Sequence, residues 1–226
     1  RIGVLPYSVV NKNFTNLFVW SLLICFCEHA RGALPWKIAY EQNFEKIQEG
    51  RLPDDFFVLD GRFSVQQRNA RKCLILPGNP VGEFGFLFGP RFGLETMELS
   101  YSCLGGIKSR RHSAFSGAIG GIRGLNYRMN PSSGKGILTY LNDWKHDDHI
   151  TWESKEWMRV YIKIVPQPVK QGMMITLKTH LESESAGPKE GFTTFLKGTL
   201  SGKCALWGFS YAEEEMRWDD ILILTR

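Results

Sequence analysis

The stretch WMRVYIKIV, residues 157–165, decides the fold class, because apolar and polar side chains alternate along it. Successive side chains of a β-strand point to opposite faces, so a period of two predicts a strand with one buried face. The predicted buried face carries four side chains: Met158, Val160, Ile162 and Ile164.

The same alternation recurs on both sides of this stretch. Residues 94–103, LETMELSYSC, and residues 173–180, MMITLKTH, each have one apolar face. These faces carry Met97, Leu99, Tyr101 and Cys103 in the first stretch, and Met173, Ile175 and Leu177 in the second. Roughly a dozen such segments, without a sustained helical period, predict an all-β domain of antiparallel sheets packed as a two-sheet sandwich.

Composition agrees with one β-rich domain. The chain has 226 residues, 13% aromatic residues, 23 glycines and a formal net charge of +5. Nucleic-acid binding would need a basic stripe with aromatic platforms. Only residues 108–112, KSRRH, come near this, and we expect them to be a solvated loop. In residues 54–66, the pair Asp60-Gly61 predicts a hairpin turn between two strands.

The first 32 residues differ from the remainder. Lys12 precedes an apolar run over residues 14–27, and small residues follow at Ala30 and Gly32. This order is typical of a secretory signal, and the run is shorter than the roughly 20 residues of a membrane span. We therefore expect a signal segment over 1–32, a domain over 33–226, and a secreted, periplasmic or cell-surface location. A buried first strand or short amphipathic helix is the alternative.

Cysteine spacing gives no metal or redox motif. Two of the five cysteines, Cys25 and Cys27, lie in the predicted signal segment, and no CxxC pair exists. Zinc knuckles and thioredoxin-type sites are therefore not supported. One disulfide or three buried thiols are both compatible with the remaining cysteines: Cys73, Cys103 and Cys204.

Several stretches, in their order, resemble the concanavalin A-like jelly-roll superfamily, which includes lectin-like, laminin-G-like and 3-keto-disaccharide hydrolase-like domains. The first feature is an opening strand with a Gly-led hairpin, and the second is Phe-Gly-Pro followed by a strand. Next come a Trp before a strand of alternating apolar residues and the hairpin partner of that strand. A closing strand completes the order. These features occupy residues 43–66, 88–102, 152–165, 172–191 and 216–223. The resemblance implies a two-sheet jelly roll whose concave face, in many members of the superfamily, holds carbohydrate.

The closing stretch MRWDDILILTR, residues 216–226, contains two adjacent aspartates. Strand alternation predicts that at least one of them faces inward, where an unpaired carboxylate is costly. The resemblance implies a structural Ca²⁺ held by Asp219, the Gly61 carbonyl and Glu45 or its neighbouring backbone. Alternatively, Asp220 points to solvent and Asp219 accepts hydrogen bonds from the backbone or Arg217.

Aromatic residues in predicted loops are the candidates for sugar binding, with polar neighbours to fix the hydroxyls. For each tryptophan, core packing is the alternative, and we expect Trp157 and Trp218 to serve packing. The predicted ligand-binding residues are Trp144, Trp152, Trp207, Tyr211, Asn142, Asp143 and Arg111.

No catalytic motif is present. Laminarinase-type enzymes of the superfamily carry Glu-x-Asp-x-x-Glu on one strand, whereas Glu95 and Glu98 lie three residues apart and fall on opposite faces. His146 to His149, HDDH, offer metal-ligand side chains in a stretch that looks like a turn. We therefore expect an exported, non-catalytic carbohydrate- or surface-binding module. Two alternatives remain: an assembly domain without a pocket, and a glycoside-acting hydrolase using Glu98, Asp143, His146 and Glu182.

Overall fold

The computed structural model describes residues 34–141, 144–150, 155–184 and 191–226. The predicted signal segment, 1–32, lies outside the described residues, as do Asn142, Asp143 and Trp152. Residues Trp36–Arg226 form a compact unit of their own. Within the described part of the chain, no helix is both long enough and apolar enough to cross a membrane.

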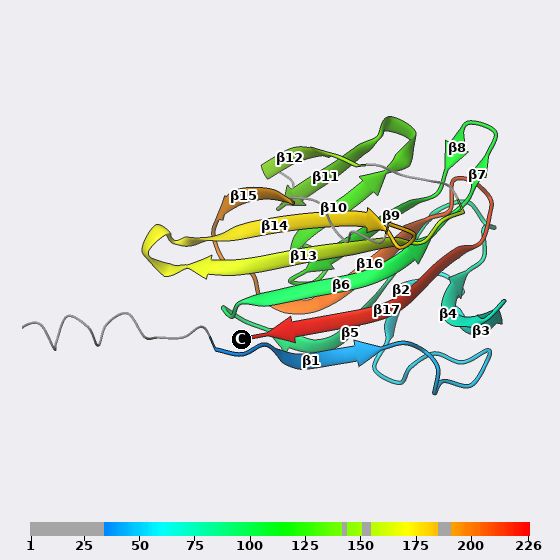
Figure 1. Ribbon diagram of the computed structural model, residues 1–226, viewed down its shortest axis with the longest axis horizontal. Helices are drawn as coiled ribbons and strands as arrows, with labels where there is room; N and C mark the ends of the chain where they lie inside the picture. Colours follow the sequence, from blue (N-terminus) through cyan, green and yellow to red (C-terminus); the bar gives the residue numbers. More distant parts are fainter. Residues whose placement is uncertain (1–33, 142–143, 151–154, 185–190) are drawn as a thin grey trace, which may run out of the picture. The chain divides into compact units, whose positions relative to one another are not determined.

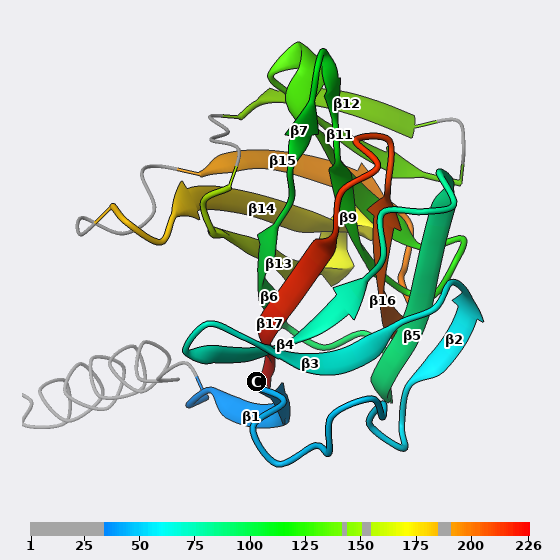
Figure 2. The ribbon, with the colours of Figure 1, turned by 90° about the vertical axis from the view of Figure 1, so that its right-hand side faces the viewer.

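Two large antiparallel sheets form a sandwich, so the predicted all-β class is confirmed (Figures 1 and 2). The eight-stranded sheet contains, from edge to edge, β15 (Phe192–Lys197), β14 (Gly172–Leu181), β13 (Met158–Gln167), β6 (Met97–Leu104), β17 (Met216–Thr225), β4 (Arg71–Leu76) and β3 (Ser64–Arg68), with β1 (Lys37–Gln42) also paired to β17. The seven-stranded sheet contains β12 (Trp144–His149), β11 (Lys135–Tyr140), β10 (Leu125–Asn130), β9 (Ala114–Ile119), β16 (Gly202–Phe209), β5 (Glu83–Phe92) and β2 (Phe57–Asp60). A hairpin of β7 (Ile107–Lys108) and β8 (Arg111–His112) and the short helices η1 (Pro131–Ser133) and η2 (Pro168–Lys170) complete the described elements.

The inner faces of the two sheets form the core, as the alternation predicts. All the apolar side chains predicted to be buried on β6, β13 and β14 are 4% exposed or less. Trp218 of β17 is fully buried, and its ring centroid lies 5.2–6.5 Å from those of Phe63, Phe86 and Phe115. Burying large aromatic rings removes much apolar surface from water, so these contacts hold the sheets together.

The predicted hairpin at Asp60-Gly61 is wrong, because its two strands belong to different sheets. β2 lies in the seven-stranded sheet and β3 in the eight-stranded sheet. Gly61 has φ +108°, and a Cβ there would lie 2.8 Å from the Cβ of Phe84. Glycine thus allows the chain to cross between the layers where a side chain would clash.

A β-bulge in β17 explains the adjacent aspartates. Trp218 and Ile221 both face the core, although two residues separate them. The register with β6 shifts between Asp219 and Leu222, and Asp220 has φ +47°. The extra residue of a bulge resets the alternation, so both carboxylates lie on the outer face of the sheet. The prediction that one of them faces inward is wrong.

Three cysteines of the described chain are free and buried: Cys73, Cys103 and Cys204. Of the two alternatives left by the sequence, the structure has the buried thiols. Burial raises the pKa of Cys73 to about 11, which keeps this thiol protonated at neutral pH.

Candidate functional site

The outer face of the seven-stranded sheet brings together aromatic and charged side chains from three strands and a loop, with a serine from a fourth strand among them. Trp207 of β16 pairs with Gly85 of β5 on one side and with Ser116 of β9 on the other. Ser116 in turn pairs with Arg128 of β10. Because the residues next to them in sequence point into the core, Trp207, Ser116 and Arg128 share the outer face.

Trp207 lies directly over the backbone of Gly85. A Cβ at Gly85 would lie 2.4 Å from the tryptophan ring, so only glycine allows this position. The Trp207 side chain is partly exposed. Its indole N–H is buried and has no hydrogen-bond partner among the described residues. The exposed part of Trp207 is therefore its flat apolar ring, while its N–H faces the protein.

A polar cluster occupies the same face. The Tyr211 hydroxyl donates a hydrogen bond of 2.6 Å to Glu83 Oε1, and Arg128 Nη2 lies 3.4 Å from that hydroxyl. Arg128 Nη1 is 3.7 Å from Glu83 Oε1, and the guanidinium carbon is 3.7 Å from the Phe209 ring centroid. Burial and the hydrogen bond to Glu83 raise the pKa of Tyr211, so its hydroxyl stays a donor.

A hollow of about 410 Å³ opens at the other end of this face. It is lined by the β9–β10 turn together with Asn126, Thr139 and Leu141. Asn126 accepts a hydrogen bond from the Ser116 hydroxyl. The turn contains Gly120 and Gly121, both at positive φ, so this glycine-rich stretch is a strand connection and does not open a helix.

Two of the predicted ligand residues, Trp207 and Tyr211, come from this face, and a third, Arg111, is linked to the Tyr211 loop. Arg111 lies on β8 and forms an ion pair of 3.3 Å with Glu213. Glu213 also pairs with Lys108 at 2.8 Å. Asn142 and Asp143 directly follow Leu141 in the sequence and lie outside the described residues, as does Trp152.

Trp144 does not belong to this face. It lies on β12, where sequence indicated a turn, and packs half-buried against the core. The next side chain on the same side, His146, stacks on Phe192 of β15, with ring centroids 4.4 Å apart. This contact joins the two sheets at one edge and leaves Trp144 inside the sandwich.

The HDDH stretch does not gather its side chains around one point. His146 and Asp148 lie on one side of β12, while Asp147 and His149 lie on the other. Asp148 accepts a 3.0 Å hydrogen bond from the buried Tyr127 hydroxyl. No group of three His, Cys, Asp or Glu side chains suited to a metal ion occurs among the residues that the structure describes.

Arg71 holds the two aspartates of β17 on the outer face of the eight-stranded sheet. Its Nε donates to Asp219 Oδ2, its Nη2 is 2.7 Å from Asp220 Oδ2, and its Nη1 is 2.8 Å from Glu182 Oε2. The guanidinium carbon lies 4.0 Å from the Trp157 ring centroid. Arg217, the partner suggested by sequence, instead pairs with Glu215. The cation beside Asp219 is therefore a side chain from 148 residues away.

The residues suggested for calcium have other neighbours. The buried Asp219 side chain, 5% exposed, also accepts a hydrogen bond from the Asp220 amide. Gly61 packs against Phe84 and other core side chains, and the Glu45 carbonyl accepts a hydrogen bond from Lys72. Calcium at this position stays a prediction that must compete with Arg71.

Protonation in the Arg71 cluster is uneven. Burial raises the pKa of Asp219 to about 6, and the charge of Asp220 adds to the effect. Although burial opposes it, hydrogen bonds from Arg71 and Ser102 lower the pKa of Glu182. A general acid at neutral pH needs a raised pKa, so Glu182 is poorly suited to that task.

Comparison with known proteins gives similarity in structure alone. The sequence matches no protein-family model and no curated protein sequence. The Emp47p carbohydrate recognition domain has a TM-score of 0.54 and 8% identity, covering 86% of this chain and 99% of that chain. Lectin II from Ulex europaeus has a TM-score of 0.51 and 10% identity, and the match covers 84% of this chain and 98% of that chain.

A protein of unknown function with a galectin-like fold from Bacillus subtilis is similar to the same degree. Its TM-score is 0.56 at 10% identity, and the match covers 85% of this chain and 100% of that chain. At such identities the likeness concerns the arrangement of the strands. The chain therefore has the concanavalin A-like jelly-roll fold.

Proposed function

We propose that this chain is an exported, non-catalytic carbohydrate-binding module that holds glycan on the outer face of its seven-stranded sheet. The observation that carries the proposal is the cluster of Tyr211, Glu83 and Arg128 on the same face as Trp207. The carbohydrate recognition named for Emp47p and the lectin II of Ulex europaeus supports the same class of ligand.

The face offers both kinds of contact that a sugar ring needs. A pyranose has an apolar C–H surface, which packs on a flat indole such as Trp207. It also has hydroxyls at its edge that both donate and accept hydrogen bonds. Arg128 donates and Glu83 accepts, and their contacts with Tyr211 and Phe209 hold them in place before a ligand arrives. Asn142, Asp143, Trp152 and Arg111 remain proposed ligand residues.

The non-catalytic part of the proposal rests on where the alternative catalytic residues lie. Glu98 pairs with Lys163 in the middle of β13, whereas the Glu182 amide bonds to the Trp157 carbonyl just before that strand begins. Six residues of extended chain, about 20 Å, therefore separate the two carboxyl groups. His146 packs elsewhere, at the edge between the sheets. Glycoside hydrolysis requires two carboxyl groups flanking one bond. The export part rests on the pattern of residues 1–32.

A glycan array screened with the full chain, followed by calorimetry on the best neutral oligosaccharide, tests this proposal. We expect Trp207→Ala to weaken binding at least tenfold and Tyr211→Phe, which removes one hydroxyl, to weaken it several-fold. Val169→Ala is the control, because Val169 is 99% exposed and lies away from this face. Circular dichroism and thermal melting must show that each variant is folded. Wild-type affinity in folded Trp207→Ala, or no neutral glycan bound at millimolar concentration, would refute the proposal.

A further inference from the structure

The outer face of the eight-stranded sheet contains two hollows that meet at Tyr161. The first, of about 450 Å³, is lined by side chains of β13, β14 and β17 and by the end of β1, including Arg159, His180 and Glu182. The second, of about 320 Å³, is lined by Glu98, Lys163, Thr176 and Lys178 together with the same tyrosine. The two hollows thus form one groove, with Tyr161 between its halves.

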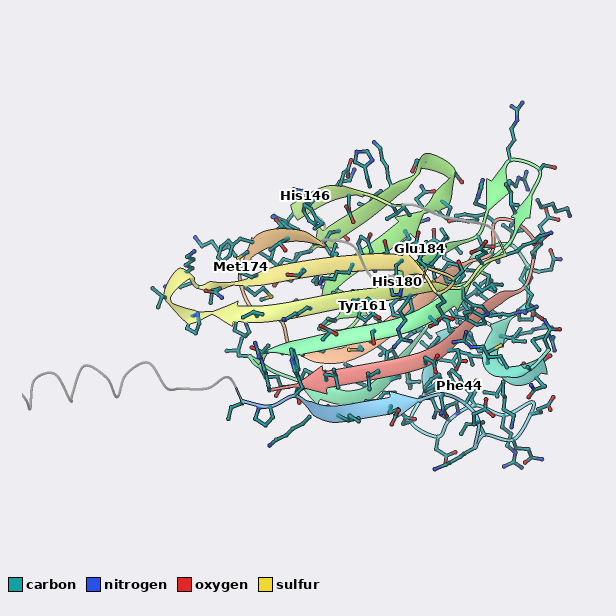
Figure 3. All side chains as sticks on the ribbon, in the orientation of Figure 1. Phe44, His146, Tyr161, Met174, His180 and Glu184 are labelled. Carbon is teal, nitrogen blue, oxygen red and sulfur yellow. The ribbon has the colours of Figure 1, made fainter. Side chains whose placement is uncertain are left out.

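Tyr161 and His180 form a stacked pair of rings in the middle of this groove. They lie side by side on β13 and β14 in Figure 3, and their rings are 14° from parallel with centroids 5.8 Å apart. His180 Nδ1 is buried and has no hydrogen-bond partner among the described residues. Ser100 and Ser102 pair with Tyr161 and Arg159 in the sheet, and the Arg159 guanidinium lies over them, 5.7 Å from the Tyr161 ring centroid.

Arg159 is held rigidly in the first hollow by groups that carry no charge. It donates hydrogen bonds to the hydroxyls of Ser100 and Ser102 at 2.9 and 3.1 Å and to the Asp220 carbonyl at 2.7 Å. Arg71, in the same hollow, is engaged by three carboxylates. Arg159 therefore offers a positioned cation that no carboxylate contacts directly, with Glu182 interacting with it across the Ser102 hydroxyl.

Lys163 and Lys178 extend the positive charge into the second hollow. Within the described part of the chain, the two lysines form no ion pair, and the same is true of Arg159. Two lysines and one carboxylate, Glu98, line the second hollow, whereas carboxylates outnumber cations in the first. The first half of the groove therefore suits a neutral hydroxylated group and the second half suits an anion.

We propose that this groove is a second carbohydrate site, which binds an acidic oligosaccharide. A hydroxylated ring packs on Tyr161 and His180, with its edge hydrogen-bonded by Arg159 and Glu182. The carboxylate or sulfate of the adjoining ring lies between Lys163 and Lys178. The site is on the other sheet from Trp207, so it acts independently of the glycan face proposed above.

Calorimetry on the full chain with three probes tests this site. Trigalacturonate carries carboxylates, its methyl ester has the same rings without charge, and a κ-carrageenan tetrasaccharide carries sulfates. We expect trigalacturonate or the carrageenan fragment to bind at least tenfold more tightly than the methyl ester at low salt. The preference should shrink in 0.5 M NaCl, because salt screens exposed charges. The two acidic probes distinguish a uronate site from a sulfate site.

Variants separate this site from the face around Trp207. Tyr161→Ala should weaken acidic-probe binding at least tenfold, whereas Lys163→Gln with Lys178→Gln should remove the preference over the methyl ester. Trp207→Ala should leave both properties unchanged. The proposal is overturned if neither acidic probe binds at millimolar concentration, or if the folded Tyr161→Ala protein binds them like wild type. Loss of binding in Trp207→Ala alone would assign the acidic glycan to the other face.

Discussion

Removing the guanidinium of Arg71 should destabilise the fold strongly, because three carboxylates depend on it. Arg71→Met keeps an unbranched apolar side chain but removes the guanidinium that lies over Trp157 and with it every hydrogen bond to Asp219, Asp220 and Glu182. Asp219 is the costliest to leave unpaired, since its side chain is 5% exposed. Asp220 and Glu182 are more exposed, and water will take over part of their solvation.

The expected loss in the free energy of unfolding is about 3 kcal/mol. Breaking a buried pair by removing one partner costs roughly 3–5 kcal/mol. The low end applies because the Arg71 side chain is 26% exposed. For a chain of this size, about 3 kcal/mol corresponds to a fall of roughly 6–12 °C in Tm.

Urea denaturation at pH 7 of wild type, Arg71→Met, Asp219→Asn and the double variant measures the coupling. We expect the double variant to be more stable than Arg71→Met, because asparagine leaves no buried charge without a cation. Melts with 5 mM CaCl₂ and with EDTA belong to the same experiment.

Two outcomes would refute this reasoning. A loss below about 1 kcal/mol in Arg71→Met would mean that the pairs contribute no more than surface ion pairs do. A fall in the wild-type Tm on adding EDTA, restored by calcium and absent in Asp219→Asn, would show that a metal ion rather than Arg71 stabilises this carboxylate.

Three further results are expected. First, the pKa of Asp219 is raised from an unfolded value near 3.8 to about 6, so the folded state binds more protons than the unfolded state between these pH values. In urea titrations, the unfolding free energy of wild type, measured relative to Asp219→Asn, should therefore fall by up to about 3 kcal/mol from pH 4 to pH 7. A difference that does not change with pH would contradict the assignment. Second, Gly85→Ala would place a Cβ 2.4 Å from the Trp207 ring, so it should lower the free energy of unfolding by roughly 1–3 kcal/mol and quench or shift the tryptophan fluorescence. Gly93→Ala is the control, because open space surrounds Gly93, and it should change neither quantity. Third, in a protein whose Cys25 and Cys27 are replaced by serine, the remaining thiols should react with Ellman's reagent only after unfolding, and one fast-reacting thiol in the native protein would contradict their burial.

The strands with strict alternation could be predicted from sequence, because their signal is local. Met158 to Ile164 reveals its buried face within seven residues, and the structure buries that face. The Asp60-Gly61 turn could not be predicted in the same way. A glycine turn looks alike whether it joins neighbouring strands or crosses between layers, and contacts with Phe84, distant in sequence, decide the outcome.

Strand β12 was missed because its solvated side chains resemble those of a loop. It is the outermost strand of its sheet, so alternate residues such as Lys145 and His149 face water. The bulge did leave a signal: Trp218 and Ile221 are both large and apolar but three residues apart, which strict alternation does not allow.

The candidate site was only partly predictable. Trp207 and Tyr211 were found because aromatic rings suit sugars. Glu83 and Arg128 were missed, since no local pattern marks them and they meet only through the pairing of β5, β16, β9 and β10. The groove around Tyr161 also depends on register, which places His180 and Arg159 opposite each other.

The position of β17 also affects how the protein is made. This strand emerges from the ribosome after every other strand, yet it lies inside the eight-stranded sheet, between β6 on one side and β4 and β1 on the other. Without it, that sheet is divided into separate pieces and Trp218 is missing from the core. The nascent chain must therefore wait, with unpaired strand edges exposed, until β17 has been synthesised, and this is the stage at which chaperones would matter most.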